Sequence, residues 1–261
     1  MLPLVDMHVH LYAGLDDGPQ TMADAIEMCR IAVSEGIGSC AAVAHQSEQW
    51  PEVTPDRIRS AWSKLTEALH KLGIPLSVFP SAEVAACPDL VTRWHAGTLM
   101  SVADRGNYLL LELPHGTFVD VRQVVLELRA GGIRPIIAHA ERTPELLHEP
   151  GIIEELVELD CLVQVSAGSI VDPPNPKDAQ ALRDWFRRGV VHVLGSDGHS
   201  PRRRAPKMAA AAAIVREWAG EKVAEAICSI RGMAILGGLP LRVPPPQPRA
   251  RKWYSRLLSR Y

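Results

Sequence analysis

Short apolar runs alternate with amphipathic stretches along most of this chain. Seven runs have the length and composition of buried strands. They are LVDMHVH (4–10), SCAAVAH (39–45), LSVFPSAE (76–83), YLLLELP (108–114), RPIIAHAE (134–141), CLVQVSAG (161–168) and VHVLGSD (191–197). The stretches between them have helical spacing, and one begins at Thr21 with Asp24 three residues on and ends at Gly36. This alternation predicts an α/β fold with parallel strands joined by helices.

The same pattern indicates one domain up to residue 240. The chain has 261 residues, a normal length for a single α/β barrel, and seven strands are one short of the usual eight. After Pro240 the composition changes, because RVPPPQPRARKWYSRLLSRY begins like a polyproline linker and ends without acidic residues. We therefore expect a barrel domain over 1–240 and a Pro-rich linker with a basic tail over 241–261.

Composition and charge exclude several classes of protein. The net charge of −2 gives no polycation signature for nucleic acid, and no apolar run approaches the ~20 residues of a membrane span. Five scattered cysteines without a C-x-x-C pair indicate reduced thiols. The first strand begins almost at Met1, so we expect no signal peptide and a cytoplasmic location.

Metal-capable side chains stand at the ends of these apolar runs. They are His8, His10, His45, Glu83, Glu112, His139, Asp197 and His199. The carboxyl-terminal ends of parallel barrel strands meet at one rim, where active sites lie. Burying so many imidazoles and carboxylates together is costly unless cations compensate them, so the pattern predicts a metal cluster. Imidazole and carboxylate without thiolate suit Mn, Fe or Zn, and the number of ligands suits two or three ions.

Another short motif suggests a different kind of active site from the metal cluster. Cys87 stands six residues before Arg93 in CPDLVTR, which is the spacing of cysteine-dependent phosphatases. Pro88 removes a backbone N–H from that loop, Asp89 repels phosphate, and no glycine lets the loop curl. We therefore expect Cys87 to have no catalytic role.

Several motifs together resemble the PHP (polymerase and histidinol phosphatase) superfamily. They are DMHVH, the strand-end AH at His45, AE at Glu83, IAHAER and GSDGH. Within it, LDDGP, HAER and the late Asp-x-His followed by arginine resemble the bacterial manganese-dependent protein-tyrosine phosphatases of capsule and exopolysaccharide loci. The resemblance runs from Leu4 to about Gly238 and implies a distorted seven-stranded (β/α)7 barrel with its metal site at the carboxyl ends of the strands.

The resemblance also implies roles for individual residues. The metal ligands would be His8, His10, Asp17, His45, Glu83, Glu112, His139, Asp197 and His199. Asp17 takes this role because it directly precedes Gly-Pro, whereas Asp16 shapes the turn or supports the ligands. Arg142 and Arg204 would hold the substrate phosphate, with Arg202 and Arg203 as alternatives to Arg204. A metal-bound water, His45 or His199 would supply a proton to the leaving group.

The resemblance implies an enzyme that hydrolyses phosphotyrosine by attack of a metal-bridging hydroxide, with Mn as the first choice of metal. The expected substrate is a protein, namely a tyrosine kinase of polysaccharide biosynthesis. The alternative is a PHP phosphatase of a small phosphomonoester such as histidinol phosphate. The loop after His45, QSEQWPE, is acidic and carries Trp50, which can stack on an aromatic ring. The basic tail would contact a membrane surface, a kinase or another subunit, or be disordered, and Tyr254 and Tyr261 are candidate kinase targets.

Overall fold

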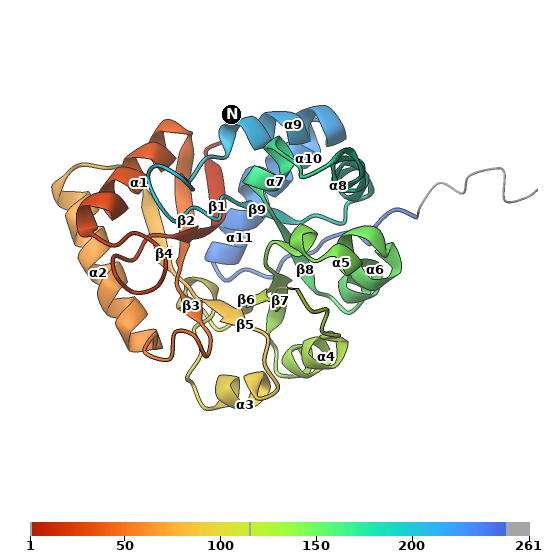
Figure 1. The fold of residues 1–261 in the computed structure, drawn as a ribbon, viewed down its shortest axis with the longest axis horizontal. Helices are drawn as coiled ribbons and strands as arrows, with labels where there is room; N and C mark the ends of the chain where they lie inside the picture. The colour runs from red at the N-terminus through yellow and green to blue at the C-terminus, as the bar shows by residue number, and fades with distance from the viewer. Residues whose placement is uncertain (1, 115, 249–261) are drawn as a thin grey trace, which may run out of the picture.

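A ring of parallel strands forms the centre of the molecule in the computed structural model, which describes residues 2–114 and 116–248 (Figure 1). The strands are β1 (Leu4–His10), β2 (Ile37–Val43), β3 (His45–Gln46), β4 (Ser77–Pro80), β5 (Glu83–Ala85), β6 (Tyr108–Glu112), β7 (Arg134–Ile137), β8 (Leu162–Ser166) and β9 (Val193–Gly195). Every pairing between these strands is parallel, which confirms the α/β class.

Nine strands occupy seven positions in the ring, because two of the expected strands are interrupted. The second apolar run divides into β2 and β3 at Ala44, and the third divides into β4 and β5. The amide of Ser81 donates to Ala42 O and the amide of Glu83 donates to Ala44 O, each at 3.0 Å. The two neighbouring segments therefore stay paired across both breaks. The sheet orders β1-β2-β4 and β3-β5-β6-β7-β8-β9 therefore form the distorted barrel that the sequence predicts.

The first and last strands close the ring. Val9 forms a parallel bridge with Gly198 just beyond β9. The amide of His10 donates to Gly198 O at 2.9 Å, and the amide of Asp197 donates to His8 O at 2.7 Å. The closure therefore brings the first two expected ligands beside the last two.

Helices lie around the ring and join its strands (Figure 1). They are α1 (Met22–Ser34), α2 (Pro55–Lys71), α3 (Leu90–His95), α4 (Arg122–Ala130), α5 (Pro144–His148), α6 (Pro150–Glu158), α7 (Ala167–Val171), α8 (Pro176–Arg188), α9 (Ala209–Ala219), α10 (Glu221–Glu225) and α11 (Arg231–Leu236), with the short helical turns η1 (Val102–Asp104), η2 (Ala140–Arg142) and η3 (Ala226–Ile230). The cap expected before α1 is present, since Thr21 Oγ1 accepts from the Asp24 amide at 3.1 Å.

Alternation along the strands separates an apolar interior from a polar rim. Leu110 and Glu112 share one face of β6, and Leu162 and Gln164 share one face of β8. The leucines belong to a buried apolar cluster that residues of α11 complete. Because the polar member of each pair comes later along its strand, the polar groups gather at the carboxyl-terminal rim.

The segment after α11 makes contacts with the barrel as far as Gln247. The hydroxyl of Tyr108 donates to Leu239 O at 2.7 Å and accepts from the Leu241 amide at 3.0 Å. The Arg188 guanidinium donates to Gln247 O at 2.7 Å. The boundary at residue 240 stays a prediction, and the basic tail with Tyr254 and Tyr261 lies outside the described residues. Within the described ranges, no helix is long and apolar enough to cross a membrane.

Candidate metal centre

The nine expected ligands lie together at the rim of the barrel. Their ligand atoms fall into four groups, and within each group these atoms lie within 4.8 Å of one another. The groups are His10, Asp17, His45 and His199; His8, His10 and Asp197; His8, Glu83 and His139; and His45, Glu83 and Glu112. Because His8, His10, His45 and Glu83 each belong to two groups, the groups form one continuous site, an arrangement suited to more than one ion.

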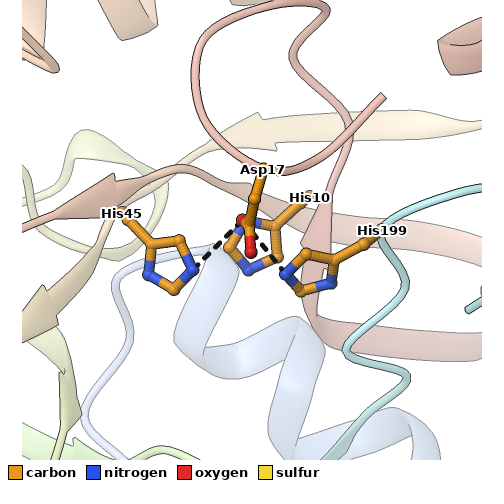
Figure 2. A group of neighbouring side chains, drawn as sticks. All are labelled: His10, Asp17, His45 and His199. Atoms are coloured by element: carbon orange, nitrogen blue, oxygen red, sulfur yellow. Dashed lines mark ion pairs between the residues drawn. The ribbon is translucent and has the colours of Figure 1, made fainter. Parts of the chain in front are cut away.

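The outermost group is built around Asp17 (Figure 2). Its Oδ1 atom lies 3.4 Å from His45 Nε2 and 3.4 Å from His199 Nε2, while His10 lies behind the carboxylate. The Asp17 side chain is 50% exposed, so this group faces solvent. Hydrogen bonds from His199 and His45 hold the pKa of Asp17 far below its usual value.

Glu83 is the centre of the buried part of the site and is only 1% exposed. Its Oε2 atom lies 3.0 Å from His8 Nε2, 3.2 Å from His10 Nε2 and 3.3 Å from His45 Nδ1. Its Oε1 atom lies 2.9 Å from His139 Nε2. Burial raises the pKa of Glu83, but the imidazoles outweigh it and hold the pKa well below the usual value. One buried carboxylate thus stays ionised among four imidazoles.

The surrounding carboxylates create a field that favours positive charge. Burial lowers the pKa of His10, but Asp16 and Glu83 outweigh it and raise the pKa to about 9. Burial also lowers the pKa of His45, but Asp17 and Glu112 outweigh it and raise the pKa to about 11. Divalent cations satisfy the same field when they replace protons on the ligands.

The orientation of two imidazoles tests whether the site fits cations. His10 Nδ1 lies 2.8 Å from Asp16 Oδ2, and His8 Nδ1 lies 3.3 Å from Gln164 Oε1. Each oxygen is placed to accept a hydrogen bond from Nδ1–H, which directs Nε2 toward a metal ion. The two Nε2 atoms are 3.3 Å apart and both face Glu83 Oε2. When a divalent ion replaces the protons on these nitrogens, the two Nε2 lone pairs and Glu83 Oε2 converge on it, so the donor set fits divalent metal ions.

Asp16 and Gln164 contact expected ligands and belong to none of the four groups. Asp16 Oδ2 also accepts from the His45 amide at 3.0 Å, in agreement with a supporting role. Gln164 was not predicted from the sequence, and its Oε1 also accepts from the His139 amide at 2.7 Å. The available signal was a long polar side chain in the middle of the buried run CLVQVSAG.

Two expected ligands are among the five non-glycine residues with positive φ in the part of the chain that the structure describes. His139 and Asp197 have φ angles of 30° and 54°, in the left-handed region that few non-glycine residues adopt. Such strain persists where the surroundings fix the conformation, and it is common at functional sites. Gly195 allows a close approach nearby, because a Cβ atom there would lie 2.4 Å from His8 Cβ.

Two arginines reach the site beside Asp197. Arg142 Nη1 lies 2.6 Å and Arg204 Nη2 lies 2.5 Å from Asp197 Oδ2. Arg202 and Arg203 are exposed and make no ion pair with the part of the chain that the structure describes. Of the three consecutive arginines, Arg204 is thus the one directed at the expected ligands. Two guanidinium groups in this position are suited to bidentate contacts with phosphate oxygens.

Several cavities open beside the site, among them two that lie next to different parts of it. The Trp50 cavity has a volume of about 540 Å³, and its wall includes Asp17, His45, Glu48, Trp50, Cys87 and Glu112. The arginine cavity has a volume of about 670 Å³, and its wall includes Arg142, Asp197, Arg202, Arg203, Arg204 and Lys207. Each cavity is lined by some of the nine expected ligands, so a bound substrate can extend from the site in two directions.

The geometry around Cys87 disfavours a cysteine-dependent reaction. Its Sγ atom lies 3.6 Å from Arg93 Nη1. Burial and the nearby Asp89 nevertheless raise the pKa of the thiol. Because the thiolate is the nucleophile in such enzymes, Cys87 lacks the activation that the chemistry needs.

Known proteins are similar to this chain over most of its length. The family model described as capsular polysaccharide synthesis, CpsB/CapC, matches residues 4–237. Tyrosine-protein phosphatase YwqE from Bacillus subtilis (strain 168) is 30% identical over 203 residues, 77% of this chain and 79% of that protein. Tyrosine-protein phosphatase CpsB from Streptococcus pneumoniae is 22% identical over 228 residues, 85% of this chain and 93% of that protein.

The fold has solved counterparts. A crystal structure from work on YwqE of Bacillus subtilis and CpsB of Streptococcus pneumoniae, described there as unique metal-dependent tyrosine phosphatases, matches with a TM-score of 0.88 and 27% identity, over 95% of this chain and 100% of that chain. Dihydropyrimidinase from Brevibacillus agri matches with a TM-score of 0.53 and 11% identity, over 92% of this chain and 72% of that chain, which shows a shared fold alone. On the extent of the family match, this chain belongs to the CpsB/CapC family of capsular polysaccharide synthesis.

Proposed function

We propose that this protein is a metal-dependent protein-tyrosine phosphatase that acts in capsular or exopolysaccharide synthesis. The observation that carries the proposal is the continuous set of four ligand groups with the guanidinium groups of Arg142 and Arg204 beside it. YwqE and CpsB, which this chain resembles over most of its length, are tyrosine-protein phosphatases. The substrate we propose is a phosphotyrosine protein, a bacterial tyrosine kinase of polysaccharide biosynthesis.

The nine residues would hold two or three divalent ions, with Mn as the first expectation and Fe or Zn as alternatives. The mixture of imidazole and carboxylate ligands without thiolate supports this choice. When bound, the ions would act as Lewis acids toward the phosphoryl oxygens. They would also lower the pKa of a bound water to about 7.

The protein's own residues position the phosphate and handle a proton. Arg142 and Arg204 bind the phosphate oxygens and stabilise the charge that develops on them as the ester bond breaks. His45 and His199 flank the half-exposed Asp17 at the open edge, where either imidazole can hold the proton that the leaving tyrosine oxygen takes up.

The two cavities favour a protein substrate over a small phosphomonoester. Each is large enough for a side chain or a small ligand, and together they continue the site across the rim.

The five free cysteines support a reducing, cytoplasmic location for the enzyme and its substrate. Comparing kcat/KM for histidinol phosphate and for a phosphotyrosyl peptide separates the two substrates, and we expect the peptide to be preferred.

A phosphatase assay on p-nitrophenyl phosphate tests the proposal. We expect activity with added Mn²⁺, loss on chelation and recovery when Mn²⁺ is restored. Because Cys87 lines the Trp50 cavity, alkylation could block substrate entry, so the Cys87→Ser variant is the better control. Activity that survives chelation and is lost in Cys87→Ser would overturn the metal site. Metal analysis of protein purified without oxygen identifies the native ion.

A further inference from the structure

We propose that the arginine cavity is a subsite for acidic residues that flank the phosphotyrosine, so that the enzyme selects acidic segments of its substrate protein. The inference rests on the proposed phosphatase function and adds a specificity to it. Arg142 and Arg204 are assigned to the phosphate itself. The subsite consists of Arg202, Arg203 and Lys207, which line the same cavity.

The charges of this cavity remain positive after its ion pairs are counted. Three acidic residues also line it, namely Glu35, Asp172 and Asp197. Asp197 is engaged by Arg142 and Arg204. Glu35 Oε2 accepts hydrogen bonds from the amides of Met208 and Ala209 at the start of α9, at 3.2 and 3.0 Å. Its negative charge therefore interacts with the positive end of the helix dipole.

Arg202, Arg203 and Lys207 remain available for a ligand. All three side chains are exposed, and none forms an ion pair with any residue in the ranges 2–114 and 116–248. Only Asp172 opposes them inside the cavity. An unpaired cluster of this kind attracts carboxylates, both by steering the encounter and by forming ion pairs at the rim of the interface.

The cavity is also placed where flanking residues would lie. Its wall includes Arg142, Asp197 and Arg204, so it continues directly from the phosphate position. An extended peptide advances about 3.4 Å per residue, so the first three residues beside a phosphotyrosine fall within about 10 Å. The Trp50 cavity does not offer the same attraction, because its charged residues outside the nine expected ligands are Glu48 and Arg93, one of each sign.

The test compares three phosphotyrosyl peptides that differ only in the three residues on each side of the phosphotyrosine, with glutamate, glutamine or lysine at all of them. In the wild-type enzyme at low salt we expect KM to be about fivefold lower for the glutamate peptide than for the glutamine peptide, as two exposed ion pairs allow. We expect kcat to be unchanged and the preference to disappear at high ionic strength.

The variant R202Q/R203Q should lose this preference while it hydrolyses p-nitrophenyl phosphate at the wild-type rate. The matched control is R30Q/K71Q, which also removes two exposed positive charges, on α1 and α2. It should keep the preference. The variant R202E/R203E should prefer the lysine peptide, a change of sign that simple loss of stability cannot produce.

The outcomes separate this inference from the proposed function. Wild-type enzyme that fails to hydrolyse p-nitrophenyl phosphate with Mn²⁺ overturns the phosphatase proposal, and fluorescence anisotropy of labelled peptides then measures the same preference as a ratio of Kd. Equal KM or Kd values for the three peptides in the wild type overturn the subsite. So does a preference that survives in R202Q/R203Q or falls equally in the control.

Discussion

The two cavities share one site and differ in almost everything else. The Trp50 cavity lies beside β3 and β5, has an aromatic side chain and a thiol in its wall, and has nearly balanced charges outside the ligands. The arginine cavity lies beside the loop after β9 and has three cations that form no ion pair among the described residues. The same ring of strands thus presents a surface for an aromatic ring on one side and a surface for acidic groups on the other. This difference would orient a bound substrate, with its aromatic ring at the Trp50 cavity and its acidic residues at the arginine cavity.

The largest expected effect comes from removing the group that both sides share. Glu83→Gln takes away the carboxylate that lies among four imidazoles, so phosphatase activity should fall by at least about 1000-fold for every substrate, as loss of several kcal/mol of transition-state stabilisation implies. The measurement is kcat/KM together with the number of bound ions. Glu67→Gln on the exposed face of α2 is the control. Near-wild-type activity in Glu83→Gln would remove Glu83 from the centre.

A second test asks whether the phosphate sits between the cavities. Arg142→Gln and Arg204→Gln should each lower kcat by about 100-fold, the usual cost of losing a group that stabilises developing charge. The loss should be similar for p-nitrophenyl phosphate and for peptides, because both contacts are to the phosphate. Steady-state kinetics on the two substrates measure it. A loss limited to peptides would instead place that arginine in the subsite for flanking residues.

A third test changes a buried residue that lines neither of the two cavities. Gln164→Leu keeps the volume but leaves His8 Nδ1 and the His139 amide without their acceptor. We expect metal affinity to fall by about 10- to 100-fold, with equal effects on all substrates at limiting metal and recovery at high metal. Competition with a chelator measures the affinity, and thermal unfolding of the metal-free protein controls for stability. Unchanged affinity would show that Gln164 only packs.

The smallest effect belongs to the Trp50 cavity alone. Trp50→Leu should raise KM about fivefold for phenyl phosphates, since an aromatic contact contributes about 1 kcal/mol, and should leave KM for phosphoserine unchanged. The preference for glutamate-flanked peptides should persist. If Trp50→Leu abolishes that preference, the two cavities do not act separately.

The alternation of apolar runs and helical spacing was sufficient to predict parallel strands joined by helices, because both are local properties of the chain, whereas the seven-stranded barrel was expected from the chain length and the family resemblance. The breaks at Ala44 and between β4 and β5 could not be predicted, because they depend on how neighbouring strands fit around a closed ring. The roles of Asp16 and Gln164 are similarly non-local. Gln164 acts on His8, which lies 156 residues away along the chain.

The choice among the three consecutive arginines shows the same limit. Arg202, Arg203 and Arg204 are identical in type, and only the loop conformation decides which one meets Asp197. The amides of His199 and Ser200 donate to Arg204 O at 2.8 and 3.1 Å, and this fold-back returns Arg204 to the site. Family resemblance selected Arg204, whereas composition alone left all three open.

Ring closure between β1 and the loop after β9 also has a consequence for how the protein is made. The Ser196 amide donates to Asp6 Oδ1 at 2.8 Å across a separation of 190 residues. At ribosomal rates of about 5–20 residues per second, the first strand waits about 10–40 s for this partner. During that interval its edge is unpaired and the ligand set lacks Asp197 and His199. At the metal centre proposed above, complete metal loading would therefore be a late step in biogenesis and would report that the ring has closed.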